Sequence, residues 1–412
     1  MRIAIFTDLY LEVAGGIPSS IAAQKEALKK DGHEVKVFCP GERCDDGDVV
    51  LLPTSWLKIN GAPMARRPSA ILEFIEEKYP DFQEQFDLIH AHYEAEVSIA
   101  AVLVARKYGL PLVQTMHGRE DQAITINTPR ALQGLISGVL NSLHRKLICP
   151  KMNIEVARDK YLATTNAQAN MWSIMVRQAN EADKVLTPSE HFKLKLEHYG
   201  ASKPIEVLSN GVADENVDRK WAVRSFQKDY QSEGEKLRII WSSRVSKEKR
   251  IMPFLEALRL LRGYTNDFFF TIAGDGNEFK KAQKFVAKNG LSDNVEFLGA
   301  VRHEDVLDML GTQHLSITNS YGFDTQGLTL LEATATGLPT IFCDEDMKSV
   351  IVPGTGMCAK NETPEAMAAM LKHIMAEPEL IEKMSRKALE SRKEVLQSYW
   401  IQKLEDIYKE ML

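Results

Sequence analysis

Short apolar runs alternate with helix-length segments along the first half of the chain. The segment Pro18–Lys30 is one of the latter, because a proline stands near its start and Asp31-Gly32 follows its end. An alternation of strand and helix predicts a parallel sheet that is covered by helices on both faces. The strand-length runs of this half are Arg2–Thr7, Glu34–Phe38, Asp87–Ala91, Leu112–Met116 and Lys184–Thr187.

The second half of the chain repeats this alternation. A length of 412 residues is too great for one ordinary core, so we expect two α/β domains of the doubly wound, Rossmann-like type. Ligands bind such sheets at the carboxyl ends of the strands, where the candidate residues below all fall. The expected strands are Leu237–Ser242, Phe268–Ala273, Asn294–Leu298, His314–Thr318 and Pro339–Cys343, and the expected helices include Pro253–Arg262, Glu278–Asn289, His303–Leu310 and Leu328–Thr336.

Composition narrows the class of protein. A net charge of −6 argues against a general nucleic-acid binder, so no nucleic-acid partner is expected. The five cysteines are odd in number and form no C-x-x-C motif, which predicts reduced thiols and a reducing, cytoplasmic compartment. The N-terminal apolar run is a first strand rather than a signal peptide, and no uncharged apolar run is long enough to span a membrane.

The segment 321–332 connects an expected strand to an expected helix and carries two acids. Gly327 stands at the helix start, and the first N–H groups, around Leu328 and Thr329, have the partial positive charge that suits a phosphate. Asp324 precedes the glycine, and Glu332 shares a helix face with Leu328. Carboxylates accept hydrogen bonds from sugar hydroxyls. A phosphate beside hydroxyls indicates a nucleotide sugar.

Two cations follow the strand Leu237–Ser242. Arg244 and Lys249 lie in a basic run at its carboxyl end, where they can neutralise a leaving diphosphate. A solvated basic loop is the alternative.

The segment 321–332 resembles the acid-x7-acid signature of the family 4 retaining glycosyltransferases, which have the GT-B fold. Arg244 and Lys249 match this family's Arg and Lys separated by four residues, whereas Asp324 stands where the family usually has Glu. The resemblance implies two Rossmann-like domains facing across a cleft. Residues 1–200 form the acceptor-side domain, together with 392–412, whose helix crosses back, and residues 201–391 form the nucleotide-sugar domain.

The same resemblance implies roles for individual residues. The weaker glycine motifs are equally typical of plain turns, and Asn210 of an Asn-Gly pair also fits a structural role. The implied catalytic residues are Asp324, His117, Arg244 and Lys249, and the implied donor-binding residues are Gly15, Gly16, Asn210, Gly274, Gly276, Arg302, Gly327, Leu328, Thr329 and Glu332.

Polar residues also follow two strands of the first half. His117 ends the strand Leu112–Met116, and His92, Tyr93 and Glu94 follow Asp87–Ala91 as candidate acceptor contacts. These residues lack the spacing of a metal site such as H-E-x-x-H. The family needs no bound metal, so we expect no metal and no cofactor besides the substrate nucleotide sugar, a UDP-hexose.

Residues 131–151 form a candidate peripheral membrane contact. Apolar residues recur on one helical stripe, and His144, Arg145, Lys146 and Lys151 add positive charge. Such a helix can lie on an anionic membrane, and the alternative is a helix packed on its own domain. The stripe consists of Leu132, Leu135, Ile136, Val139, Leu140, Leu143 and Leu147.

The first thirty residues look most similar to glycolipid-forming members of the family, such as diacylglycerol glucosyltransferases. The expected function is therefore transfer of a hexose, glucose from UDP-glucose, with retention, to a lipid or lipid-linked acceptor. The expected place is the cytoplasm, at the inner face of the plasma membrane. Three alternatives stay open: an exopolysaccharide or capsule glycosyltransferase acting on an undecaprenyl-linked sugar, a sugar-nucleotide epimerase, and a nucleotide-sugar-binding partner without turnover.

Overall fold

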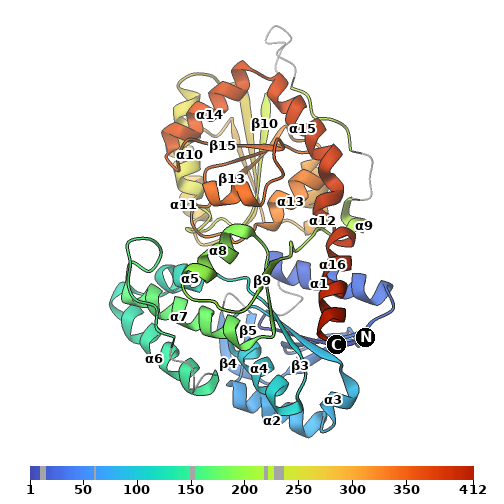
Figure 1. Ribbon diagram of the computed structural model, residues 1–412. Coiled ribbons are helices and arrows are strands. Elements are labelled where there is room, and N and C mark those ends of the chain that lie inside the picture. Colours follow the sequence, from blue (N-terminus) through green and yellow to red (C-terminus); the bar gives the residue numbers. More distant parts are fainter. Residues whose placement is uncertain (10–14, 60–61, 149–153, 218–220, 227–235) are drawn as a thin grey trace. The chain divides into compact units, whose positions relative to one another are not determined.

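The chain folds into two compact units, each built on one parallel sheet (Figure 1). Unit 1 comprises Met1–Asn210 and Trp400–Leu412, and unit 2 comprises Gly211–Tyr399. This computed structural model describes residues 1–9, 15–59, 62–148, 154–217, 221–226 and 236–412. The fifth cysteine, Cys149, and Lys151 of the candidate membrane contact lie outside these residues. The described cysteines, Cys39, Cys44, Cys343 and Cys358, are reduced thiols, as expected.

Unit 1 contains a seven-stranded sheet in the order β3-β2-β1-β6-β7-β8-β9, with every neighbouring pair parallel. Side chains alternate between the two faces of β1, so that Ile3 and Ile5 join one core and Ala4 and Phe6 the other. The strands are β1 (Arg2–Thr7), β2 (Glu34–Pro40), β3 (Val49–Leu52), β6 (Leu88–His92), β7 (Leu112–Thr115), β8 (Lys184–Thr187) and β9 (Ile205–Val207).

Helices cover both faces of this sheet (Figure 1). Helix α1 packs on one face, whereas α2, α3, α4, α7 and α8 pack on the other. A short hairpin, β4 (Thr54–Ile59) and β5 (Ala62–Ala65), lies outside the main sheet. The helices are α1 (Gly16–Lys30), α2 (Pro68–Lys78), α3 (Phe82–Gln85), α4 (Glu96–Tyr108), α5 (Glu120–Asn127), α6 (Arg130–Ile148), α7 (Asn166–Glu181) and α8 (Glu190–His198).

Unit 2 contains a six-stranded parallel sheet in the order β12-β11-β10-β13-β14-β15. Helices α10, α11 and α14 pack on one face, and α12 and α13 pack on the other. The strands are β10 (Leu237–Ser242), β11 (Phe268–Ala273), β12 (Val295–Gly299), β13 (Leu315–Thr318), β14 (Thr340–Phe342) and β15 (Gly356–Cys358). The helices are α9 (Asp214–Val217), α10 (Ile251–Arg262), α11 (Phe279–Lys288), α12 (His303–Leu310), α13 (Leu328–Ala335), α14 (Pro364–Ala376) and α15 (Glu379–Ser391), with 3₁₀ turns at Glu345–Ser349 and Arg392–Val395.

The last helix, α16 (Gln397–Met411), returns the chain to unit 1, as the sequence led us to expect. Ile401, Leu404 and Tyr408 join the apolar core beneath α1. The Tyr408 hydroxyl lies 2.6 Å from His90 Nδ1, and the other ring nitrogen of His90 lies 2.7 Å from Thr115 Oγ1. The C-terminal helix is therefore tied to the middle of the unit 1 sheet.

Each sheet reverses its winding direction beside its first strand. In unit 1 the chain moves from β1 to β2 and β3 on one side, and then from β6 to β9 on the other. In unit 2 the same reversal separates β10 from β13. At such a switch point the loops after the two central strands diverge and leave a crevice for a ligand. The fold thus marks the ends of β1 and β6, and of β10 and β13, as places for binding.

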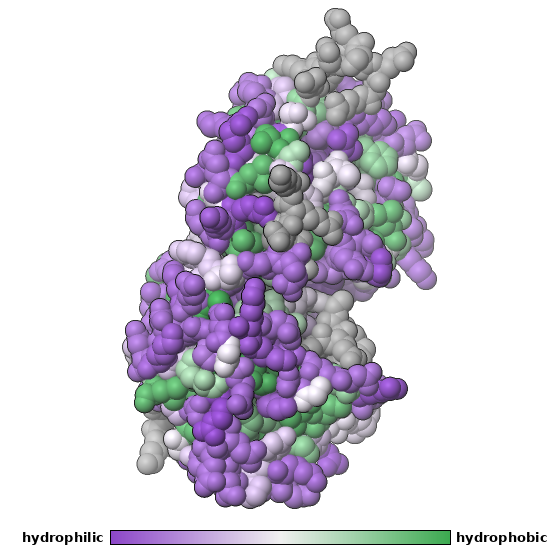
Figure 2. Space-filling view, turned by 90° about the vertical axis from the view of Figure 1, so that its right-hand side faces the viewer, coloured by the Kyte–Doolittle hydropathy of each residue, from purple (hydrophilic) through white to green (hydrophobic). Residues whose placement is uncertain are grey.

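Hydrophobic residues on the face shown in Figure 2 form separate patches among hydrophilic ones. Of the helices that the structure describes, none combines the length and the apolar character needed to cross a membrane.

We expect Tyr408→Phe to lower the free energy of unfolding by about 1–3 kcal/mol, because His90 Nδ1 would stay buried without this partner. Urea unfolding of the variant measures this effect. Tyr264→Phe, at an exposed tyrosine of unit 2, is the control and should leave stability unchanged. Equal stability of the two variants would contradict a structural role for the Tyr408 hydroxyl.

Candidate active site

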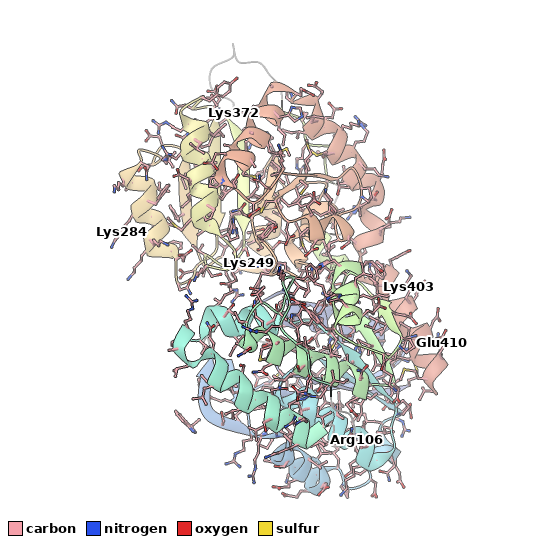
Figure 3. All side chains as sticks on the ribbon, turned by 60° about the vertical axis from the view of Figure 1, so that its left-hand side comes forward. Arg106, Lys249, Lys284, Lys372, Lys403 and Glu410 are labelled. Atoms are coloured by element: carbon pink, nitrogen blue, oxygen red, sulfur yellow. The ribbon has the colours of Figure 1, made fainter. Side chains whose placement is uncertain are left out.

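Lys249 and Asp324 form an ion pair at the switch point of unit 2. Lys249 Nζ lies 2.5 Å from Asp324 Oδ1, and both side chains are largely buried. Burial alone would raise the pKa of Asp324, but Lys249 and, more weakly, Arg244 outweigh it and hold that pKa below its ordinary value. Figure 3 shows Lys249 at the opposite end of unit 2 from Lys372. The structure thus brings together two residues that the sequence singled out separately.

The loop that carries Lys249 is fixed by its neighbour. Arg250 has a φ of 59°, an unusual left-handed conformation for a residue with a side chain. Its carbonyl accepts a hydrogen bond of 2.9 Å from Asn319 Nδ2, which stands just after β13. Its guanidinium donates to the carbonyl of Glu362 at 2.7 Å. These bonds hold the strained turn, and with it Lys249, against the end of β13.

Gly327 lets the chain enter α13 in a conformation that favours glycine, with a φ of 81°. No side chain caps this helix, so the N–H groups at Leu328 and Thr329 keep the character of a helix N-terminus. A Cβ on Gly327 would lie 4.0 Å from Asp324 Oδ2, which places the helix start close to the ion pair. A cation and a helix N-terminus therefore stand side by side, as an anion site requires.

Glu332 is buried on α13, and its carboxylate lies 2.6 Å from Nε2 of His303. This hydrogen bond raises the pKa of His303 above its ordinary value, although partial burial opposes it. The sequence did not single out His303, and the donor contact predicted for its neighbour Arg302 stays a prediction. Arg302 is 73% exposed and pairs with Glu304 at 2.5 Å and Asp305 at 2.8 Å. Within unit 2, His303 rather than Arg302 contacts the second acid of the signature.

Gly274 and Gly276 pack against the loop after β10. A Cβ would lie 2.0 Å from the carbonyl oxygen of Ser243 at the first position and 2.4 Å from that of Val245 at the second. This close approach alone requires glycine, and it braces the loop that carries Arg244. Arg244 itself is exposed and lies 3.2 Å from Glu248.

In unit 1, Gly15 and Gly16 lie exposed at the start of α1. Asn210 follows β9 at the end of this unit's first segment, and its carbonyl accepts a hydrogen bond of 3.2 Å from Ser20 of α1. The predicted donor contacts of these three residues stay predictions.

His117 and His92 meet at the ends of β7 and β6. His92 Nδ1 lies 2.9 Å from His117 Nε2. Burial lowers the pKa of His117 to about 3, and that of His92 falls well below its ordinary value for the same reason. Both rings are therefore neutral near pH 7 and act as hydrogen-bonding groups rather than cations.

Glu94 holds the loop that contains His117. Its carboxylate accepts backbone N–H bonds from His117 at 2.5 Å and from Gly118 at 2.9 Å. The neighbouring Tyr93 has a φ of 77°, and its hydroxyl donates to Glu120 at 2.6 Å. Among the described residues, Tyr93 and Arg250 are the two non-glycine positions with positive φ, and each stands beside a candidate site.

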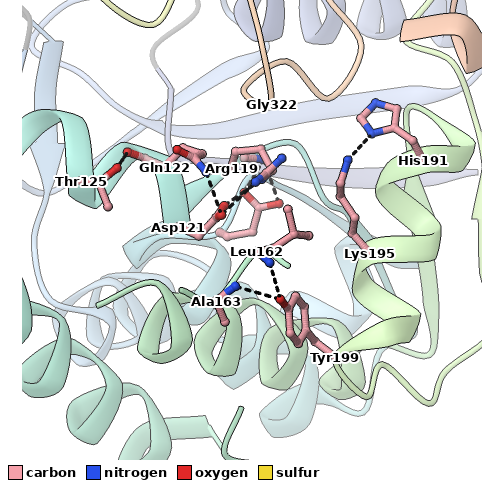
Figure 4. Close-up of polar contacts among 12 residues, drawn as sticks. Arg119, Asp121, Gln122, Thr125, Leu162, Ala163, His191, Lys195, Tyr199 and Gly322 are labelled. Carbon is pink, nitrogen blue, oxygen red and sulfur yellow. Dashed lines mark hydrogen bonds and ion pairs between the residues drawn. The ribbon is translucent and has the colours of Figure 1, made fainter. Parts of the chain in front are cut away.

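A buried ion pair supports the segment after this loop. Arg119 donates two hydrogen bonds to Asp121, at 2.8 and 2.9 Å (Figure 4). Its guanidinium also lies 5.6 Å from the centroid of the Trp172 ring on α7. These contacts anchor the start of α5 next to His117.

On helix α6 the usual distribution of side chains on a surface helix is reversed: polar residues are buried and apolar ones are exposed. Its buried side is polar, with Ser137, Asn141 and His144 turned toward the protein beside Ile148. The large apolar side chains of the predicted stripe are exposed instead, by 37–67%. These are Leu132, Leu135, Ile136, Val139, Leu140, Leu143 and Leu147, which we call the α6 apolar face. None of these side chains belongs to the apolar cores of unit 1.

Two parallel Rossmann-like sheets, with a cation, two acids and a helix N-terminus at one switch point, define a glycosyltransferase of the GT-B type. Residues 14–216 match the family described as Glycosyltransferase Family 4, and residues 223–391 match Glycosyl transferases group 1. The chain belongs to family 4 of the glycosyltransferases and is an enzyme. No group of acidic, histidine and cysteine side chains in the described part of the chain is arranged to hold a metal ion.

Relatives and solved structures agree with this assignment. The chain is 24% identical to an alpha-monoglucosyldiacylglycerol synthase of Acholeplasma laidlawii, covering 100% of this chain and 98% of the relative. It is also 24% identical to the alpha-monoglucosyldiacylglycerol synthase of Streptococcus pneumoniae, over 83% and 70%. A sucrose-phosphate synthase of Thermosynechococcus elongatus and Anabaena HepE with UDP and glucose each align with a TM-score of 0.68, at 16% and 14% identity and at least 98% coverage of both chains. These two likenesses show the fold.

We expect Lys249→Ala to lower turnover by about 10²–10³-fold, because it removes a preorganised positive charge. It should also lower the free energy of unfolding, since Asp324 loses its ion-pair partner, by at most about 3–5 kcal/mol. Lys247→Ala, in the same loop but exposed, is the matched control. Adding Asp324→Asn to Lys249→Ala should restore stability without restoring turnover. Full activity of Lys249→Ala would remove this lysine from the mechanism.

The His303–Glu332 pair should make stability depend on pH. Because the folded protein raises the pKa of His303 above the ordinary 6.5, the contribution is complete below that value and disappears as pH rises through the raised pKa. Wild type should therefore have a larger free energy of unfolding than His303→Gln, and this difference should be greater at about pH 5.5 than at about pH 8.5. Urea unfolding at both pH values measures this difference, and a gap that does not change with pH would contradict the ion pair.

Proposed function

We propose that this glycosyltransferase moves a hexose, glucose from UDP-glucose, onto a lipid or lipid-linked acceptor at a membrane surface, with retention at the anomeric carbon. The α6 apolar face is the observation that carries the acceptor side of this proposal. This helix buries polar side chains and exposes seven large apolar ones. An exposed apolar surface of this kind marks a contact with a membrane or another apolar partner.

A lipid bilayer fits the α6 apolar face. The face follows a single helix along its whole length, as an interfacial helix does when it lies in the plane of the membrane. Arg130 at its start and Arg145 and Lys146 in its last turn place positive charge at both ends. Such charge is attracted to anionic lipid headgroups. The two relatives whose names denote synthesis of a glucosyl diacylglycerol support the same class of acceptor.

On the donor side, we assign the diphosphate to Lys249, Arg244 and the N–H groups around Gly327, Leu328 and Thr329. These groups stabilise the negative charge that develops on the diphosphate as its bond to the sugar breaks. The diphosphate would compete with Asp324 for Lys249 and so release Asp324 to bind sugar hydroxyls. Glu332 would accept hydrogen bonds from the ribose hydroxyls.

Several candidate residues of unit 1 also take part in the proposed reaction. Gly15 and Gly16 would contact the donor phosphate, and His117, which is neutral near pH 7, would hydrogen-bond to the transferred sugar. His92 and Glu94 are turned toward His117 and its backbone, so we assign them to positioning it, and Tyr93 to the acceptor. No metal or further cofactor takes part in the proposed reaction.

The test uses UDP-glucose and vesicles of phosphatidylglycerol and phosphatidylcholine, with or without diacylglycerol, and follows UDP release and labelled lipid. The double variant Leu135→Ser/Leu143→Ser should bind vesicles at least about tenfold more weakly, because each exposed leucine contributes about 1.5–3 kcal/mol when buried. Its UDP affinity should be unchanged. Leu194→Ser, at an exposed leucine on α8, is the matched control and should bind as wild type does.

Glucolipid formation by wild type supports the proposal. Transfer only to an undecaprenyl-linked sugar would instead make the protein a polysaccharide enzyme, and UDP binding without turnover would make it a non-catalytic partner. Vesicle binding that the double variant retains in full would separate the α6 apolar face from the membrane.

A further inference from the structure

The buried side of α6 meets α7 through hydrogen bonds rather than apolar packing. Asn170 of α7 donates to Ser137 at 3.1 Å and accepts from Asn141 at 3.1 Å. Arg177 of α7 donates to Asn141 and, at 2.8 Å, to the carbonyl of Ile154. Ile148 is the one apolar residue among the buried positions of α6 that the structure describes. Because hydrogen bonds are directional, a shift of α6 would change the geometry of these particular contacts with α7.

One line of these contacts leads from α6 to the candidate acceptor site. Arg177 Nε donates to His144 Nδ1 at 3.4 Å, so the proton of the neutral ring lies on Nε2, which is 3.2 Å from Gln178 Oε1. Gln178 Nε2 donates to Gln114 Oε1 at 3.1 Å, and Gln114 Nε2 donates to the carbonyl of Tyr93 at 2.7 Å. We call the path Arg177–His144–Gln178–Gln114–Tyr93 the buried relay.

Every bond of the buried relay points the same way, from α6 and α7 toward Tyr93. His144, Gln178 and Gln114 are all buried, and burial lowers the pKa of His144 to about 4, so its ring stays neutral and keeps one tautomer. Hydrogen bonds in such a chain polarise and strengthen one another. The loss of one link therefore weakens the bond at Tyr93 even when the break lies near α6.

The far end of the buried relay is a strained position. Tyr93 has a φ of 77°, a conformation that costs of order 1–3 kcal/mol and persists only where the surroundings hold it. The carbonyl bond from Gln114 and the N–H bond to Thr115, at 3.2 Å, hold it on both sides. Glu94 is the next residue, and its carboxylate accepts hydrogen bonds from the N–H groups of His117 and Gly118. The backbone angle at Tyr93 thus sets the position of the whole loop cluster.

From this geometry we infer that His144 and Gln178 are positioning residues for the acceptor site, and that they link it to α6. Lipid contact at the α6 apolar face fixes His144, and the buried relay passes this constraint to Tyr93 and the His117 loop. The enzyme is then more active at a membrane surface for a reason other than local acceptor concentration. This inference rests on the proposed function, because it needs a lipid surface and an acceptor.

The test separates surface activation from acceptor concentration. A water-soluble short-chain diacylglycerol serves as acceptor, and phosphatidylglycerol vesicles without acceptor are added or omitted. For wild type, vesicles should raise kcat/KM for the soluble acceptor several-fold. Gln178→Met and His144→Phe replace these polar side chains by apolar ones of similar shape and so break the buried relay. Both variants should bind vesicles, lose this stimulation and show a raised acceptor KM with an unchanged donor KM.

A matched control on α6 distinguishes the buried relay from general damage to the helix. Gln133 donates to the carbonyls of Thr125 and Thr128 and takes no part in the buried relay. Gln133→Met should therefore retain vesicle stimulation, and thermal melts monitor the folding of all three variants. Stimulation retained by both Gln178→Met and His144→Phe would overturn the inference, as would wild type that vesicles do not stimulate. Wild type that transfers sugar to no lipid acceptor would instead overturn the proposed function.

Discussion

The reversal of winding direction beside the first strand of each sheet is the constraint on which both candidate sites depend. It sends the loops after β1 and β6, and after β10 and β13, away from each other, and the space between them is where a parallel sheet can hold a ligand. Lys249, Asp324, Tyr93 and Glu94 follow β10, β13 and β6, and His117 follows the neighbouring strand β7. Tyr93 and Arg250, the two non-glycine residues with positive φ in the described part of the chain, follow β6 and β10. Regular structure stops at these points, and side-chain hydrogen bonds take over the task of fixing the backbone.

Charge is balanced separately within the unit 2 site. Asp324 is paired with Lys249, and Glu332 with His303, so each acid of the signature has a basic partner at hydrogen-bond distance. Burial of an unpaired carboxylate would be costly. In the protein without a ligand, Lys249 and His303 therefore pair with these two acids. In the proposed donor complex, a nucleotide diphosphate would add negative charge to this balance and compete with Asp324 for Lys249. Donor binding would then be an exchange of partners, in which the sugar hydroxyls replace Lys249 at Asp324.

Sequence alone predicted most of the architecture, because buried parallel strands are continuous apolar runs. The strands β1, β8, β10 and β11 have the predicted bounds. The edge strands β3 and β15 were missed, since they are short and carry no alternation that separates them from loops. Helical periodicity likewise found the stripe on α6 but could not say which way it faces. Only the polar partners on α7 show that the stripe points outward.

Site residues could be predicted where a motif fixes their spacing. They could not be predicted where a single contact in the folded protein brings them to the site. Asp324, Gly327 and Lys249 come from spacing, and the structure places them together in unit 2. His303 carries no pattern of its own, because a single histidine at a helix start has many explanations. Its contact with Glu332 arises only when α12 and α13 cover the same face of the sheet. The role of Glu94 as a clamp on the His117 loop was hidden in the same way.

A crystal structure of the protein with bound UDP tests the central claim most directly. We expect the diphosphate to lie beside Lys249 and the first N–H groups of α13, with the ribose hydroxyls on Glu332 and the Lys249–Asp324 distance increased. A diphosphate bound away from Lys249 and Gly327, or a ribose that does not touch Glu332, would contradict it.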